Sequence, residues 1–307
     1  MSAVYLRFNA RRTAGLQRAP LLERLLARAD SAAREPDWRS AAFSLVSAAQ
    51  ALPAIAAVAQ FADLGSVDCA SVFLATPVHY VAAMSSVQLP ADGLLELQPQ
   101  EARALAEDFN RLWGDAGASM MAGPGGALYC GFDEPVRAQS SDPQRVAGKD
   151  IGEFLPTGAD APRLRLLMSE IEMWLFEHSV NRMRAARGAV PISGLWLWGG
   201  GAVLAQLPSL AGWTAGEDAL FRAFPACTHY PRGAGSGVVV LEQTPGSESW
   251  PEAQARWLRP ALAELGAGRI EELRLSAGER CYSLSAGWRW RFWRRPSAWW
   301  ESFDDDA

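Results

Sequence analysis

Residues 178–201 read H-S-V-N-R-M-R-A-A-R-G-A-V-P-I-S-G-L-W-L-W-G-G-G, and this stretch decides the fold class. Gly188 stands where a helix C-terminal cap with positive φ is expected, and Pro191 prevents the helix from resuming. The run 195–198 is apolar throughout, which is typical of a central strand covered on both faces. Three glycines then let the chain leave the strand without a Cβ clash. The stretch therefore predicts a helix, a tight turn, a buried strand and a glycine loop.

The apolar face of that helix extends upstream over residues 160–187. Apolar side chains recur there at helical spacing, and one turn of polar residues continues the same face. The face consists of Leu164, Leu167, Met168, Ile171, Leu175, His178 and Asn181. Arg184 and Arg187 fall in the last turn, where cations suit the helix dipole. We therefore expect one long helix over 160–187.

The same residues form a candidate ligand site. In α/β folds, ligands gather at the carboxyl ends of strands. His178, Asn181 and Arg184 are expected near that end of the predicted strand, and Gly199, Gly200 and Gly201 would offer backbone N–H groups to a phosphate. The alternative is a well-packed helix–turn–strand unit in which these polar side chains are satisfied internally. The pattern alone does not separate a packed polar residue from a binding one, so both interpretations stay open.

The stretch resembles the pattern H-P-V-N-x-x-R-x-x-x-G-x-x-P-V-N-S-L-W-x-W-G-x-G of a bacterial family described as phosphoglycerate-mutase-like, or RpfE-type regulatory, proteins. Ser179, Ser193 and Gly194 replace the proline, asparagine and serine of that pattern. The segment 76–80, T-P-V-H-Y, is similar to the family's D-P-V-H-L without its aspartate. Glu101-Ala102, Asn110 and the segment 291–295, R-F-W-R-R, are similar as well, so the resemblance spans about residues 74–295.

This family is a remote relative of the cofactor-independent phosphoglycerate mutases of the alkaline-phosphatase superfamily. The resemblance therefore implies an α/β, three-layer sandwich with a central, mostly parallel or mixed sheet, as in a reduced alkaline-phosphatase-like fold. Authentic members of that superfamily use two metal ions held by several aspartates and histidines. The resemblance therefore raises the question whether this chain has such a two-metal site.

The histidines argue against that two-metal chemistry. The chain has three histidines, His79, His178 and His229, and none lies in a D-x-H-x-x-x-H arrangement or beside clustered carboxylates. Neither a G-x-S-x-G elbow nor a phosphate-binding G-x-x-x-x-G-K-[ST] loop is present. We therefore predict no metal site and no cofactor, and no catalytic residue can be named.

Two functional hypotheses follow. The first is a non-catalytic, phosphoglycerate-mutase-like regulatory or interaction protein that binds a protein partner or a small anionic ligand. The second is an enzyme that acts on a phosphate ester or similar small anion, using His178, Arg184 and the glycine loop.

Composition and patterning limit the environment of the chain. The 307 residues carry a net charge of −5, which argues against a general nucleic-acid binder. The amino terminus lacks the apolar core of a secretory signal, and four scattered cysteines suggest free thiols in a reducing cytoplasm. The uncharged stretch 40–62 is alanine-rich and interrupted by Pro53, so it predicts two buried helical pieces rather than a membrane span.

The remaining patterns predict alternating helices and strands. The polar segment 139–150 is the clearest linker, so we expect an N-terminal α/β half over 1–138 and a C-terminal α/β half over 151–307, which together could make one domain. Helices are expected over 20–33, 99–113 and 250–265, and strands over 72–78, 94–97, 119–121, 127–132, 238–241, 270–275 and 280–284.

The segment 288–300 reads W-R-W-R-F-W-R-R-P-S-A-W-W. Its strict alternation over 288–292 favours a terminal strand with arginines on its outer side. The other interpretation is an exposed surface in which arginine and aromatic side chains contact single-stranded bases or a membrane interface. The acidic tail after it would pair with those arginines or with a partner.

Overall fold

Strand β1 (Ala3–Ala10) pairs with strands from the far end of the chain. It lies between β11 (Gly237–Gln243) and β12 (Glu272–Ala277) and is parallel to both. The computed structural model describes residues 2–10, 18–49, 51–84, 86–243 and 249–302. Because of the pairing of β1, the chain divides into unit 1, Met1–Leu52 with Pro208–Ala307, and unit 2, Pro53–Leu207.

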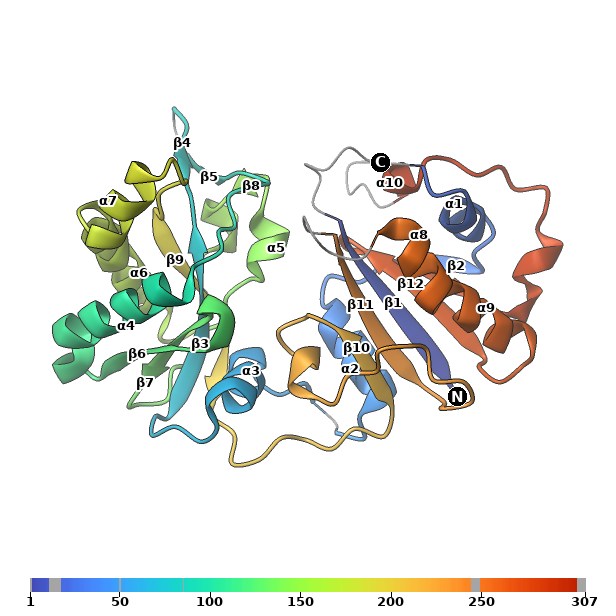
Figure 1. Cartoon of the computed structure of the whole chain (residues 1–307), viewed down its shortest axis with the longest axis horizontal. Helices are drawn as coiled ribbons and strands as arrows, with labels where there is room; N and C mark the ends of the chain where they lie inside the picture. The colour runs from blue at the N-terminus through green and yellow to red at the C-terminus, as the bar shows by residue number, and fades with distance from the viewer. Residues whose placement is uncertain (1, 11–17, 50, 85, 244–248, 303–307) are drawn as a thin grey trace. The chain divides into compact units, whose positions relative to one another are not determined.

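Unit 1 contains a six-stranded mixed sheet in the order β10-β11-β1-β12-β13-β2 (Figure 1). Its other strands are β10 (Trp213–Gly216), β13 (Arg280–Leu284) and β2 (Ser31–Arg34). The first four strands run parallel, and β13 is antiparallel to both β12 and β2. The prediction of a mixed α/β fold is therefore confirmed.

Helices cover both faces of this sheet and make three layers. Alternate residues of β1 face opposite ways, as in any strand. Leu6 belongs to the apolar core shared with Leu25 of α1 (Pro20–Ala27) and Leu262 of α9 (Arg259–Gly266). Tyr5 instead stacks on Trp38 at the start of α2 (Trp38–Val46), with ring centroids 6.4 Å apart. The predicted helix over 250–265 is α8 (Trp250–Ala253), a π-helical turn (Gln254–Leu258) and α9 in succession.

Unit 2 is built on a four-stranded sheet in the order β6-β7-β3-β9, in which every pairing is antiparallel. These strands are β6 (Ala118–Ala122), β7 (Leu128–Phe132), β3 (Ser71–Val78) and β9 (Gly194–Ala202). The strand predicted over 195–198 is therefore confirmed, but it lies at the edge of an antiparallel sheet rather than in the centre of a parallel one. It is buried because α3 (Ile55–Leu64) and α6 (Ala161–Phe176) both pack on it.

The rest of unit 2 is made of short elements around α4 (Pro99–Trp113), whose bounds agree with the prediction. These elements are β4 (Val81–Ala82), β5 (Val87–Leu89), α5 (Pro143–Val146), β8 (Lys149–Asp150) and α7 (Ser179–Ala186). The predicted strand over 94–97 is reduced to one bridge between Leu94 and Val78. The uncharged stretch 40–62 contains most of α2 and α3, as expected. None of the helices within the described ranges has the length and apolar composition that a membrane-spanning segment requires.

The segment 139–150 lies inside unit 2 and does not separate the units. It contains α5 and β8, Gln139 bridges to Thr157, and Lys149 pairs with Leu89 of β5. Its polar composition reflects its exposure. The boundaries between the two units lie near residues 52 and 207 instead. Neither boundary has the composition of a linker.

The aromatic segment near the C-terminus is not a strand. Residues Ala286–Trp290 form a 3₁₀ helix, followed after an irregular stretch by the short helix α10 (Trp299–Ser302). Arg291 Nη1 donates to the carbonyl of Arg28, and Arg294 Nη1 donates to that of Ala29, which fixes the segment to the end of α1. These arginines are thus bound to carbonyls at a helix end, while the side chains of the neighbouring aromatic residues are left largely exposed.

Candidate functional site

The helix predicted over 160–187 is interrupted at His178. Helix α6 ends at Phe176, and α7 begins at Ser179. His178 has an extended backbone, φ −67° and ψ 143°, and its Nδ1 accepts a hydrogen bond from the N–H of Val180 at 3.1 Å. His178 is therefore the N-cap of α7 rather than a mid-helix residue. This chain has Ser179 where the pattern that it resembles carries a proline, which favours the first turn of a helix, so its own sequence does not mark this helix start.

The His178 imidazole is held on every side. Its Nε2 lies 2.9 Å from Asp108 Oδ2 of α4, its ring packs edge-on against Trp174 at 4.6 Å, and its side chain is 4% exposed. Because Nδ1 accepts a hydrogen bond, the proton of the neutral ring resides on Nε2 and is donated to Asp108. Burial lowers the pKa of His178, and the positive charges of Arg182 and Arg111 lower it further. Both effects favour the neutral form of the ring.

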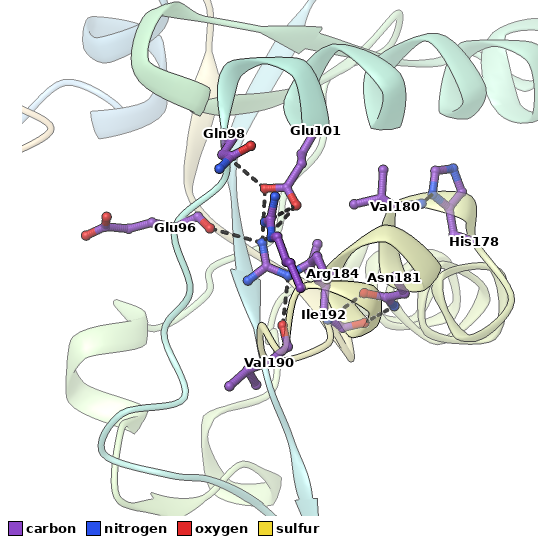
Figure 2. A network of polar contacts seen from close by, with 10 residues as sticks. Glu96, Gln98, Glu101, His178, Val180, Asn181, Arg184, Val190 and Ile192 are labelled. Carbon is purple, nitrogen blue, oxygen red and sulfur yellow. Dashed lines mark hydrogen bonds and ion pairs between the residues drawn. The ribbon is translucent and has the colours of Figure 1, made fainter.

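Asn181 joins the end of α6 to the segment that enters β9. Its Nδ2 donates to the carbonyls of Leu175 and Ile192, both at 2.8 Å. Its Oδ1 accepts from the N–H of Ile192, also at 2.8 Å. The buried amide thus makes a two-way bridge to the backbone of Ile192, and this bridge sets the path of the chain between helix and strand (Figure 2).

Arg184 lies at the centre of a buried ionic network (Figure 2). Its Nε donates to the carbonyl of Val190 at 2.7 Å, and its Nη1 contacts the carbonyl of Glu96 at 3.3 Å and Glu101 Oε2 at 3.1 Å. The Arg184 and Glu101 side chains are 6% and 4% exposed, and Arg187 Nη2 binds the other carboxylate oxygen of Glu101 at 2.6 Å. The arginine therefore connects α7, α4 and the loop before β9.

Sequence reasoning noted Glu101 as part of the family resemblance but did not assign it as the partner of Arg184. Glu101 also accepts from the backbone N–H of Gln98 at 2.8 Å and so closes the capping box of α4. The sequence contained a signal for this helix cap, because Gln98 and Glu101 have the spacing of a capping box and Pro99 stands between them at the helix start. A local pattern identifies the cap, but it does not show that the same carboxylate binds an arginine 83 positions away.

The three glycines belong to β9 and serve close packing. Gly199 has φ +64°, and a Cβ on Gly200 would lie 2.1 Å from the ring of Phe73. A Cβ on Gly201 would lie 2.7 Å from that of Ala54. The glycines therefore let the strand approach a neighbouring aromatic ring and the start of α3, and the predicted glycine loop is a continuation of the strand.

The two segments that carry the family resemblance, 76–80 and 178–201, lie side by side in part. Strands β3 and β9 pair antiparallel, with Val78 opposite Gly194, and this register places His79 next to Ser193. His79 Nδ1 is 3.0 Å from the carbonyl of Pro191 and 3.2 Å from Ser193 Oγ. The structure therefore brings His79, but not His178, beside the turn that leads into β9.

The histidines do not gather in one place. His79 contacts the turn before β9, His178 contacts α4, and His229 belongs to unit 1. Within the described ranges, no group of three or more His, Cys, Asp or Glu side chains is arranged to hold a metal ion. All four cysteines are free thiols, as the sequence suggested.

The chain has a remote sequence similarity to cofactor-independent phosphoglycerate mutases. It is 37% identical over 86 residues to the 2,3-bisphosphoglycerate-independent phosphoglycerate mutase of Methanothrix thermoacetophila, which covers 25% of this chain and 22% of that protein. It is 41% identical over 59 residues to a probable enzyme of the same name from Geobacter sulfurreducens, covering 19% and 15%. The match thus spans less than a quarter of either relative. No protein-family model matches the chain.

Two solved structures are similar over most of the chain. A cofactor-independent phosphoglycerate mutase from Thermoplasma acidophilum has a TM-score of 0.35 and 14% identity, covering 94% of this chain and 90% of that one. A protein from Pyrococcus horikoshii has a TM-score of 0.36 and 12% identity, covering 96% and 90%. Superpositions of this quality do not relate individual residues.

Proposed function

We propose that this chain is a phosphoglycerate-mutase-like regulatory or interaction protein of the RpfE type, which binds a protein partner or a small anionic ligand in the cytoplasm and does not catalyse phosphoryl transfer. The observation that carries the proposal is the contact set of Arg184. Its guanidinium binds two backbone carbonyls and the buried Glu101 carboxylate. An arginine with those partners supports the fold and is poorly placed to bind a phosphate as well.

The contacts of His178 support the same conclusion. Its Nδ1 is engaged as the cap of α7 and its Nε2 is engaged with Asp108. A general base needs a free nitrogen within reach of the proton that it removes. The prediction that His178, Asn181 and Arg184 bind a ligand would therefore require this network to rearrange.

The pair formed by His79 and Ser193 also lacks the geometry of an activated nucleophile. The Pro191 carbonyl only accepts hydrogen bonds, so the His79 Nδ1 at 3.0 Å from it carries the proton. The same nitrogen is the one nearest to Ser193 Oγ, and a protonated nitrogen cannot receive the serine proton. Ser193 is thus a hydrogen-bonding residue of the turn.

The proposal is tested by assaying the purified chain for interconversion of 3-phosphoglycerate and 2-phosphoglycerate, with and without added Mn²⁺. We expect no turnover above that of a buffer control under either condition. Turnover that rises with Mn²⁺ and disappears with a chelator would refute the proposal and support the second hypothesis, an enzyme for a phosphate ester or similar small anion.

A further inference from the structure

Helix α6 presents an apolar seam to solvent on the face opposite to its contact with β9. The buried residues of the helix include Leu164, Leu167, Met168, Ile171 and Leu175. The seam consists of Pro162, Leu166, Ser169, Met173 and Phe176, which are all exposed. Their spacing alternates between four and three residues, which is the spacing of the contact stripe in helix pairs.

The exposure of the seam is unusual for side chains of this kind. Leu166 is 61% exposed, Met173 is 70% exposed and Phe176 is 85% exposed. Single exposed apolar residues are common on protein surfaces, but a continuous row along one helix marks an interaction surface. From Pro162 to Phe176 the row is about 21 Å long at 1.5 Å per residue.

The charges beside the seam are separated along the helix. Arg163 and Arg165 lie in its first half, and Glu170, Glu172 and Glu177 lie in its second half or just beyond it. Arg163 Nη1 lies 3.4 Å from a carboxylate oxygen of the exposed Glu134, and its guanidinium lies 5.8 Å from the ring centroid of Phe132. The helix face is therefore basic at one end and acidic at the other, and its outer row is apolar except for Ser169 at the middle.

Such a face is complementary to a second copy of itself turned end for end. If Ser169 faces its counterpart, Pro162 and Phe176 lie seven residues to either side and face each other across the pair. Leu166 lies three residues before Ser169 and Met173 lies four residues after it, so these two side chains also face each other across the pair. A two-fold axis repeats each contact, as isologous interfaces require.

The charges obey the same symmetry. Arg163 lies six residues before Ser169, and Glu177 lies eight residues after it on the same flank of the seam. On the other flank, Arg165 Nε donates to the carbonyl of Pro156 and the half-buried Glu172 lies against Gly194 of β9, so both charges are engaged within the chain. An antiparallel pair therefore brings Arg163 of one copy toward Glu177 of the other, whereas a parallel pair keeps these two charges at opposite ends of the interface.

We propose that the outer face of α6 is the interface of a homodimer in which two copies of α6 pack antiparallel about Ser169. This inference rests on the charge symmetry and the apolar seam, and it is independent of the proposed function. One helix pair is a small interface, so we expect the dimer to have a low affinity and to dissociate on dilution.

The test is sedimentation velocity of the full chain from about 1 μM to about 1 mM, the range in which weak complexes dissociate. The 33.2 kDa chain should shift toward twice that mass as concentration rises. Met173→Glu should weaken the dimer by at least about tenfold, as expected for an anchor residue at the centre of an interface. Met84→Glu is the matched control, because Met84 is likewise an exposed methionine but lies outside the seam.

A charge exchange tests the orientation of the pair. Arg163→Glu should weaken the dimer, and the double variant Arg163→Glu/Glu177→Arg should restore it, because the opposite charges meet again. Thermal melting of each variant establishes that it is folded. A monomer throughout the range, equal effects of the two methionine variants, or no recovery in the double variant would overturn the proposal.

Discussion

Replacing Arg184 by alanine tests whether the buried network supports the fold or serves a ligand. The variant removes the donors to the carbonyls of Val190 and Glu96 and the ion pair with Glu101. A binding residue can be removed with little effect on stability, whereas a residue that holds two carbonyls and a buried carboxylate in place cannot. The two interpretations therefore predict different free energies of unfolding.

The expected cost follows from the partners left behind. Each hydrogen bond lost to one of the part-buried carbonyls of Val190 and Glu96 costs about 1 kcal/mol. Removing one partner of a buried ion pair costs about 3–5 kcal/mol when the other charge is left alone. Glu101 keeps Arg187 and its capping contact with Gln98, so we expect only about 1 kcal/mol from that term. The sum is about 3 kcal/mol, or roughly 6–12 °C in Tm for a domain of this size.

The assay is thermal and urea unfolding followed by tryptophan fluorescence, with Arg187→Ala as the matched control. Arg187 binds the same carboxylate of Glu101, but its side chain is 38% exposed, so its loss should cost less than about 1 kcal/mol. If Arg184→Ala and Arg187→Ala melt within a degree or so of each other, the argument for a structural network is wrong, and the ligand-site hypothesis for Arg184 gains support.

Two further predictions concern the ends of α7. Burial lowers the pKa of His178 in the folded chain below its unfolded value of about 6.5, so unfolding takes up a proton when the pH is below about 6.5. The stability that the neutral His178 contributes is therefore complete above about pH 6.5 and declines as the pH falls. His178→Asn keeps a hydrogen-bond acceptor at the N-cap but removes the group that takes up the proton. The free energy of unfolding of this variant should therefore fall less steeply between pH 7 and pH 5. A pH dependence equal to that of the unchanged chain would contradict the lowered pKa of His178. At the other end, Gly188 has φ +71° with open space around it, so Gly188→Val should cost about 1–2 kcal/mol through backbone strain alone. Gly114→Val is the control, since Gly114 has equally open surroundings but φ −55°, and equal losses in thermal unfolding would count against the strain argument.

Local patterns predicted most of the elements correctly. Helix α4, the hairpin of β6 and β7, and the strands β3, β11, β12 and β13 follow from periodicity and turn residues, because these are properties of neighbouring residues. Gly188 was also assigned correctly as a helix end with positive φ. The interruption at His178 was missed because the apolar spacing continues across it and no proline or glycine marks the break.

The sequence by itself determined the mixed α/β class and the run of elements, and it singled out His178, Asn181 and Arg184, which are buried and hydrogen-bonded. Only the tertiary structure decided their partners. Arg184 meets Glu101, and His178 meets Asp108 70 positions away, through contacts between separate helices that no local spacing encodes. The place of β9 at a sheet edge and the joining of β1 to β11 and β12 were likewise decided by long-range pairing. Burial makes a covered edge strand and a central strand look alike in sequence, because both select apolar side chains on both faces.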